Sequence, residues 1–123
     1  MPDFPITLAD IYQARARIAP LVVRTPLLRS ALLSERAGAA VYMKLENVQQ
    51  TGSFKARGAL NKLLSLRETE RAGGVVSAST GNHGAAVAFA AARVGCQARF
   101  CKSPSPIEES YNRSSSSKRS NPR

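Results

Sequence analysis

The sequence predicts an α/β fold built around a parallel sheet. From Thr7 to Cys101, segments with helical periodicity alternate with short apolar segments typical of strands, and the links between them are short. The 123 residues are enough for one small domain, and 43% of them are hydrophobic. Because the chain has no Trp, four Phe and three Tyr, we expect an aliphatic core rich in alanine.

The first predicted helix begins after Thr7, a good N-cap that has Asp10 three residues later as a variant of the capping box. Four apolar residues then fall on one helical face, and Pro20 ends the helix. They are Leu8, Ile11, Ala14 and Ile18. Residues 24–27 must be extended, because the residue before a proline avoids the helical region.

The middle of the chain predicts two further helices with a strand between them. We expect Ser30 to cap a short helix that runs to Arg36 and Gly38 to end it. Residues 41–46 alternate in the manner of a strand. Ser53 is then the expected N-cap of a helix over residues 54–66.

The last periodic part predicts strand, helix and strand. Glycines at 73–74 interrupt the chain, and residues 75–78 are typical of a short buried strand. Residues 80–84 form a turn that opens an alanine-rich helix, which Gly95 ends. Residues 97–101 begin another strand.

The composition changes near Phe100. No aliphatic side chain follows Ile107, and serines and basic residues dominate. Such a segment buries too little apolar surface to offset the entropy of ordering it. We therefore expect residues 102–123 to form a basic, serine-rich disordered tail.

The net charge of +10 raises the question of nucleic-acid binding. Residues 1–98 hold 12 basic and 6 acidic residues, spread singly, and residues 99–123 hold 6 and 2. A basic tail attracts anions through counterion release, but no motif indicates specific binding to nucleic acid. No apolar run reaches the roughly 18 residues of a membrane span.

The N-terminus has no signal-peptide pattern, and Cys96 and Cys101 do not form a CxxC pair. We expect two ordinary thiols in a reducing cytoplasm.

The segment Thr-Gly-Ser-Phe-Lys-Ala-Arg-Gly over residues 51–58 places Lys55 in the first turn of an expected helix. The positive end of the helix dipole disfavours a protonated ammonium there, and Schiff-base chemistry with an aldehyde requires the neutral amine. The spacing is not that of a phosphate-binding P-loop. Taken alone, a lysine early in a helix is most often a solvated surface residue, so that alternative stays open.

The segment Ser-Thr-Gly-Asn-His-Gly over residues 79–84 opens the next helix. Its hydroxyls, amide and glycines suit a carboxylate or phosphate at the helix N-terminus, although a plain N-capped turn is the alternative. It is not the dinucleotide-binding fingerprint. Because His83 is the only histidine, a histidine-rich metal cluster is excluded, and we expect no metal site.

Together these segments resemble the signature of fold-type II pyridoxal-phosphate enzymes, whose fold is similar to that of the tryptophan synthase β subunit. The matching segments are residues 24–27, 44–47, 50–59 and 79–84. Within that family the sequence is most similar to threonine dehydratases, serine racemases and hydroxyectoine-utilisation dehydratases. The resemblance covers roughly residues 6–98, and the order and spacing of the four segments agree.

The resemblance implies a role for each matching residue, with pyridoxal 5'-phosphate as the cofactor. Lys55 matches the lysine that carries the cofactor covalently and moves the α-proton of the substrate. Phe54 matches the aromatic residue packed on the cofactor ring, and Asn82 the asparagine that binds its phenolic oxygen. The loop that grips the substrate α-carboxylate corresponds to Ser79, Thr80, Gly81 and His83.

The implied reaction is the loss of water from L-threonine or L-serine, which gives a 2-oxo acid and ammonia. The pyridine ring of the cofactor serves as the electron sink. The resemblance assigns residues 1–67 to the N-terminal part of the larger domain and residues 74–101 to the start of the smaller one. It leaves open whether intact members form homo-oligomers.

The resemblance ends near Ala98, where family members continue with more α/β units. Their loop for the cofactor phosphate, and the residue that faces the pyridine nitrogen, come after the point at which this chain ends. We therefore expect this chain to be inactive alone, and a shifted reading frame after Ala98 is one hypothesis for the tail.

Three alternatives stay open: a fragment of a serine racemase or hydroxyectoine-utilisation dehydratase, a non-catalytic interaction protein, and nonspecific anion binding by the tail.

Overall fold

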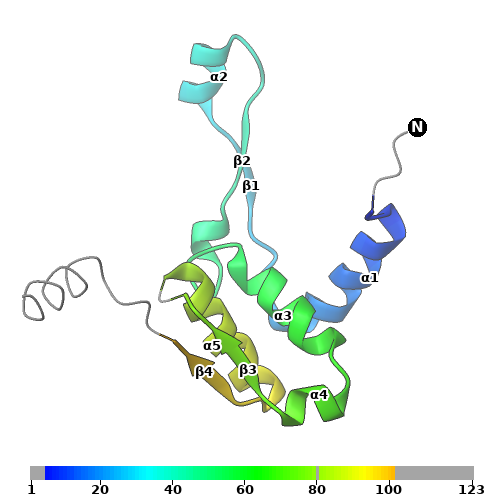
Figure 1. The fold of residues 1–123 in the computed structure, drawn as a ribbon. Coiled ribbons are helices and arrows are strands. Elements are labelled where there is room, and N and C mark those ends of the chain that lie inside the picture. Colours follow the sequence, from blue (N-terminus) through cyan, green and yellow to red (C-terminus); the bar gives the residue numbers. More distant parts are fainter. Residues whose placement is uncertain (1–4, 80, 102–123) are drawn as a thin grey trace, which may run out of the picture.

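The computed structural model describes residues 5–79 and 81–101, and Figure 1 shows their arrangement. Helices, short 3-10 turns and four strands follow one another along the chain. The expected disordered tail over residues 102–123 lies outside the described residues, as does Thr80. The described part is an α/β arrangement, which confirms the predicted fold class.

Helix α1 (Leu8–Ile18) has the predicted N-terminal cap. The Thr7 hydroxyl accepts from the Asp10 amide at 3.3 Å, while the Asp10 carboxylate accepts from the Thr7 amide at 2.8 Å. The helix ends at Ile18, and Pro20 lies in the following 3-10 turn η1 (Ala19–Leu21). Only Ile18 of the helix is buried, so most of its apolar face is exposed.

Strands β1 (Leu27–Arg29) and β2 (Tyr42–Lys44) form a separate two-stranded sheet. They are antiparallel, with Leu28 opposite Met43, so the expectation of a single parallel sheet was wrong for this pair. Helix α2 (Ala31–Ala37) lies at the tip of this hairpin and turns the chain back (Figure 1). A parallel crossover would instead need a helix packed on the face of the sheet.

The caps of α2 confirm the prediction. The Ser30 hydroxyl accepts from the Leu33 amide at 3.3 Å, and Gly38 adopts the left-handed conformation with a φ of 61°.

Helix α3 (Lys55–Ser65) follows the 3-10 turn η2 (Glu46–Val48) and packs against α5 (Asn82–Val94). The prediction that Ser53 caps α3 was wrong. Phe54, with a φ of −62° and a ψ of −15°, already has helical geometry and occupies the cap position, and no side chain caps the helix. A short helix that we did not predict, α4 (Glu68–Ala72), precedes the glycine pair.

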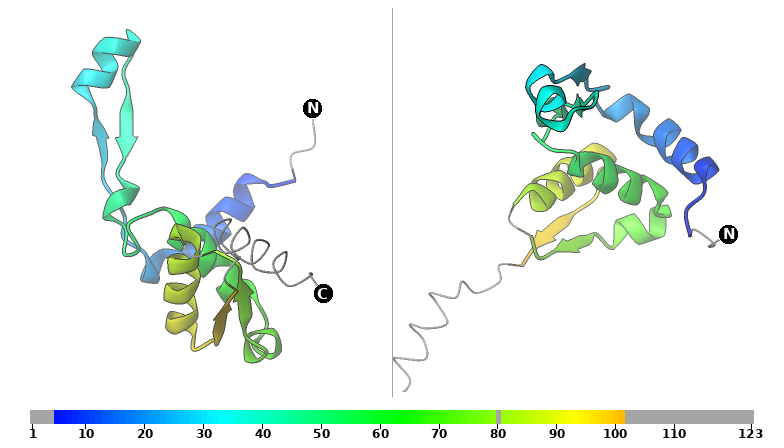
Figure 2. Two further views of the ribbon diagram at one scale, coloured as in Figure 1. Left: turned by 60° about the vertical axis from the view of Figure 1, so that its left-hand side comes forward. Right: turned by 90° about the horizontal axis from the view of Figure 1, so that it is seen from above.

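Strands β3 (Val75–Ser77) and β4 (Ala98–Phe100) are parallel, as predicted, with Val76 opposite Arg99. Helix α5 connects them, which makes a βαβ unit (Figure 2). Gly95 ends α5 in the left-handed conformation, with a φ of 67°, as predicted.

The core is aliphatic and rich in alanine, as predicted. It lies between α3 and α5, and Ile18 of α1 joins it. Leu60 is its largest fully buried side chain. The other buried apolar residues of this cluster are Ala59, Leu63, Ala86, Val87, Ala90 and Ala91.

Candidate functional site

The helix pair brings the two motif loops to one end of the core. Helices α3 and α5 run side by side and begin at the same end, as Figure 1 shows. Lys55 is the first residue of α3, and Asn82 is the first residue of α5. The first N–H groups of each helix have no partner within their own helix, so both starts favour negative charge.

Lys55 and Phe54 are both exposed at the start of α3. The Lys55 Nζ lies 5.1 Å from the centroid of the Phe54 ring, which is 59% exposed. A large aromatic side chain this open to solvent has most of its stacking surface free. The amine and the aromatic ring that the sequence singled out are therefore adjacent and accessible.

The second loop follows the carboxyl end of β3, the end of a parallel strand where ligands bind in α/β sheets. Ser79 is half-buried, and its amide donates to the Ser77 hydroxyl at 3.3 Å. Gly81, Asn82 and His83 are exposed. These residues therefore form an accessible surface at the start of α5, while Thr80 lies outside the described residues.

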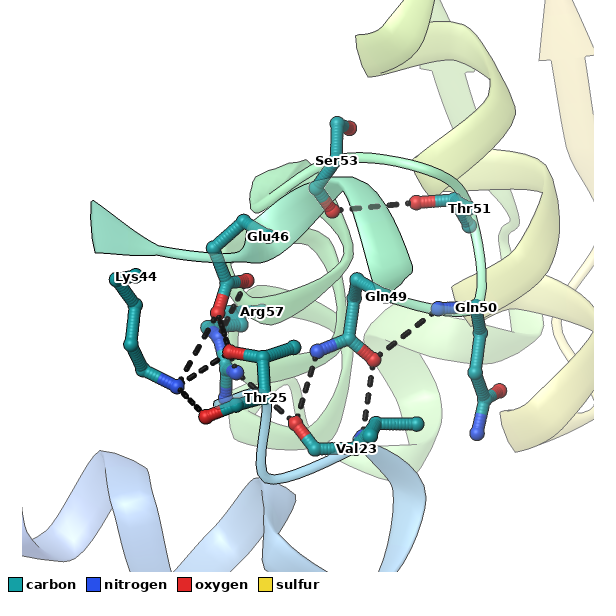
Figure 3. A network of polar contacts seen from close by, with 9 residues as sticks. All are labelled: Val23, Thr25, Lys44, Glu46, Gln49, Gln50, Thr51, Ser53 and Arg57. Atoms are coloured by element: carbon teal, nitrogen blue, oxygen red, sulfur yellow. Dashed lines mark hydrogen bonds and ion pairs between the residues drawn. The ribbon is translucent and has the colours of Figure 1, made fainter. Parts of the chain in front are cut away.

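A polar network that the sequence analysis did not identify holds the start of α3 (Figure 3). Arg57 donates to Glu46 twice, from Nη2 to Oε1 at 2.7 Å and from Nε to Oε2 at 2.9 Å. The Thr25 hydroxyl donates to Glu46 Oε1 at 2.5 Å, and Lys44 Nζ donates to Thr25. The network therefore joins the segment before β1, the end of β2 and the first turn of α3.

Gln49 extends this network, because its side-chain amide forms two hydrogen bonds with the backbone of Val23. Its Nε2 donates to the Val23 carbonyl at 3.0 Å, and its Oε1 accepts from the Val23 amide at 2.9 Å. Arg57 Nη2 also donates to the Val23 carbonyl, at 3.0 Å. Gln49 is buried, so its two bonds to Val23 are partly shielded from water, whereas the bond from Arg57 to Val23 is exposed.

The network lowers the pKa of Glu46 from its ordinary 4.5 to about 2. The largest cause is the hydrogen bond from Arg57; partial burial acts in the opposite direction, and Thr25 and the positive charge of Lys44 add to the lowering. In return, the carboxylate raises the pKa of Arg57. Glu46 is thus fully ionised at neutral pH.

Glu46 and Arg57 belong to the segments 44–47 and 50–59 that carry the resemblance. The signal was therefore present in the sequence, but nothing in the spacing of the two residues indicated that their side chains meet.

A family model described as "Pyridoxal-phosphate dependent enzyme" matches residues 18–110, which is most of the chain. The chain belongs to this family. Members of this pyridoxal-phosphate enzyme family depend on the cofactor that the motifs imply, so the expected family and cofactor are confirmed.

Two relatives within the family are named for reactions of L-threonine. The chain is 54% identical over 86 residues to an L-threonine ammonia-lyase of Thermotoga maritima, covering 70% of this chain and 21% of the relative. It is 44% identical over 93 residues to the catabolic L-threonine dehydratase of Escherichia coli, covering 76% and 28%.

A solved structure of maize serine racemase superimposes with a TM-score of 0.71 at 41% identity, covering 79% of this chain and 30% of that one. The chain thus spans less than a third of the length of each of these three relatives.

The residues at the start of the helix pair fit pyridoxal phosphate. An accessible primary amine, which the cofactor aldehyde requires, stands beside an exposed aromatic ring on which a planar group attached to that amine would stack. Asn82 offers an exposed amide at the start of the neighbouring helix. Within residues 5–79 and 81–101 there is no group of three His, Cys, Asp or Glu side chains that could hold a metal ion.

The helices of the described residues include none that is long and apolar enough to cross a membrane.

Proposed function

We propose that this chain supplies the lysine-bearing part of a pyridoxal-phosphate-dependent ammonia-lyase that acts on L-threonine or L-serine. The observation that carries the proposal is the position of Lys55, exposed beside Phe54 at the end of the helix pair where Asn82 also begins its helix. The names of the relatives support this reaction class. Because the chain spans less than a third of those relatives, the activity is that of a complete fold to which this chain contributes.

In this proposal each residue has a distinct task. Lys55 would carry the cofactor and then take the α-proton of the amino acid. Phe54 would pack on the cofactor ring, and the Asn82 amide would donate to its phenolic oxygen. The substrate α-carboxylate is held by the loop residues Ser79, Thr80, Gly81 and His83, whose roles rest on the resemblance of the loop.

When bound, the cofactor supplies an electron sink that accepts the pair left behind when the α-proton departs. The protein's own task is to place the Lys55 amine beside that proton and to fix the α-carboxylate. The start of α5 suits the carboxylate, because its free N–H groups and the helix dipole stabilise negative charge. Holding the substrate between two helix starts limits its motion relative to the amine.

The domain assignment follows from the same proposal. We infer that residues 1–67 contribute to the larger domain of the complete enzyme and residues 74–101 begin the smaller one. We further infer that the protein works in the cytoplasm. Cys96 and Cys101 are free thiols, and a reducing compartment keeps thiols in that state.

Borohydride reduction after incubation with pyridoxal phosphate tests the proposal without requiring turnover. Reduction fixes the cofactor on the lysine that carries it, and peptide mass mapping then locates the label. We expect the label on Lys55 in preference to Lys62, an exposed lysine on the same helix. Lys55→Ala should lose most of the label and Lys62→Ala should keep it; equal labelling of both lysines in the unmodified chain would refute the proposal.

Racemisation of serine is a second candidate, favoured by the structural similarity to maize serine racemase. The two reactions share Lys55 and the loss of the α-proton and differ in the step that follows. A complete enzyme that carries residues 6–98 of this chain would decide between them, because dehydration releases ammonia and racemisation releases D-serine.

A further inference from the structure

We propose that the Glu46–Arg57 pair is a positioning device that sets the direction of Lys55 at the start of α3, an inference that rests on the proposed function of Lys55. Arg57 lies two residues after Lys55, in the same first helical turn. Its guanidinium is fixed by two bonds to Glu46 and one to the Val23 carbonyl. The turn that carries the lysine is therefore attached on its far side to two other segments of the chain.

The start of α3 needs such an attachment because it has no cap of its own. Phe54 occupies the cap position and offers no side-chain acceptor. The hydroxyl of Ser53 is buried and has no hydrogen-bond partner among the described residues, and Figure 3 shows it turned away from the network. A helix start without a cap frays, and Lys55 as the first helical residue would move with it.

An aromatic residue in the cap position is what the proposed function requires, since Phe54 stands beside the Lys55 amine. The cap position of α3 therefore holds no capping side chain, and Arg57 restores the lost order from within the same first turn. Glu46 suits the role because its side chain is only 18% exposed and Arg57 only 30%, so solvent and salt screen the pair weakly.

The geometry of the pair makes a specific demand on residue 57. Two parallel bonds to one carboxylate need the planar fork of a guanidinium, whereas an ammonium is a point charge that cannot make both. Arg57→Lys keeps the positive charge and should still lose the orientation. A merely charge-based role would tolerate that substitution, so the lysine variant separates positioning from general electrostatics.

The test measures how strongly pyridoxal phosphate and borohydride label Lys55 relative to Lys62. We expect Arg57→Lys and Glu46→Gln each to reduce this preference several-fold while the far-UV circular dichroism stays that of the unmodified chain. The matched control is Arg67→Lys, because Arg67 pairs with Glu70 on the exposed surface, with its side chain 80% exposed. The control should keep the full preference. Unchanged preference in the Arg57 and Glu46 variants would overturn the inference.

Amide hydrogen exchange separates failure of this inference from failure of the proposed function. If the unmodified chain shows no preference for Lys55, the proposed function falls, and exchange at residues 55–58 then decides the positioning role. Faster exchange there in Arg57→Lys, with the buried part of α5 unchanged, would support it. Exchange at residues 55–58 equal to that of the unmodified chain would refute it.

Discussion

Neutralising Glu46 tests how much the polar network contributes to stability. Glu46→Gln keeps the size of the side chain but removes the charge that Arg57 and Thr25 face. The pKa of Glu46 falls from 4.5 to about 2, chiefly through the hydrogen bond from Arg57. At about 1.36 kcal/mol per pKa unit this difference is worth about 3 kcal/mol. Because the Glu46 and Arg57 side chains keep partial contact with water, we expect Glu46→Gln to lower the free energy of unfolding by about 2 kcal/mol at neutral pH.

The sign of the pH dependence follows from the lowered pKa. The contribution is complete above pH 4.5 and disappears as the pH falls towards about 2, where the folded protein also protonates Glu46. Urea denaturation at a series of pH values, followed by circular dichroism, measures it. The difference in the free energy of unfolding between the unmodified chain and Glu46→Gln should be largest at neutral pH and should disappear in acid.

The matched control is Glu70→Gln, which removes a carboxylate from an exposed pair with Arg67 and should change stability little at any pH. A gap for Glu46→Gln that stayed constant across the acid range would show that the network is not what stabilises the ionised carboxylate. An effect of Glu46→Gln on stability no larger than that of Glu70→Gln would show the same.

Four further substitutions probe the fold by urea denaturation. Leu60→Ala truncates the largest fully buried side chain and should cost about 2–5 kcal/mol; a loss below about 1 kcal/mol would contradict the packing of α3 on α5. Ser34→Ala leaves the Val41 amide, which donates to the Ser34 hydroxyl at 3.0 Å, without that acceptor, and should cost about 1–2 kcal/mol and speed hydrogen exchange in β2. Gly95→Ala forces alanine to a φ of 67° and should cost about 1 kcal/mol, whereas Gly58→Ala, in open space within α3, should stabilise by about 0.5–1 kcal/mol. If both glycine substitutions had the same sign, the backbone assignment at one of them would be wrong.

Features decided by neighbouring residues were predictable from the sequence. The Thr7 cap, the Ser30 cap and the Gly95 stop each depend on a few consecutive residues whose side chains or backbone freedom act locally. Strands β3 and β4 were also predictable, because a buried helix between two apolar segments favours a parallel crossover.

Features decided by tertiary contacts were not predictable in the same way. Thr25, Glu46 and Arg57 meet although 21 and 11 positions separate the bonded pairs, and no periodicity encodes such a meeting. Ser53 has the composition of a cap, but the helical geometry of Phe54 moves the helix start past it. Helix α4 has no apolar face and so gave no periodic signal.

The candidate site was likewise predictable only in part from the sequence. Motif composition identified Lys55 and Asn82, and the packing of α3 on α5 places them at one end of the core. Labelling with pyridoxal phosphate tests the role of Lys55, and the role of Asn82 stays a prediction. The network beneath Lys55 emerged only from the three-dimensional arrangement.

The alanines of the core affect how far apart the two motif loops lie. Ala59 of α3 and Ala86 and Ala90 of α5 are buried in the shared core, and each contributes only a methyl group to the packing of the two helices. Such small side chains let the two helices approach closely, so the packing between α3 and α5 contributes to the separation of Lys55 from Asn82. Enlarging one of these alanines would push the two helices apart and move Lys55 away from Asn82 without changing either residue.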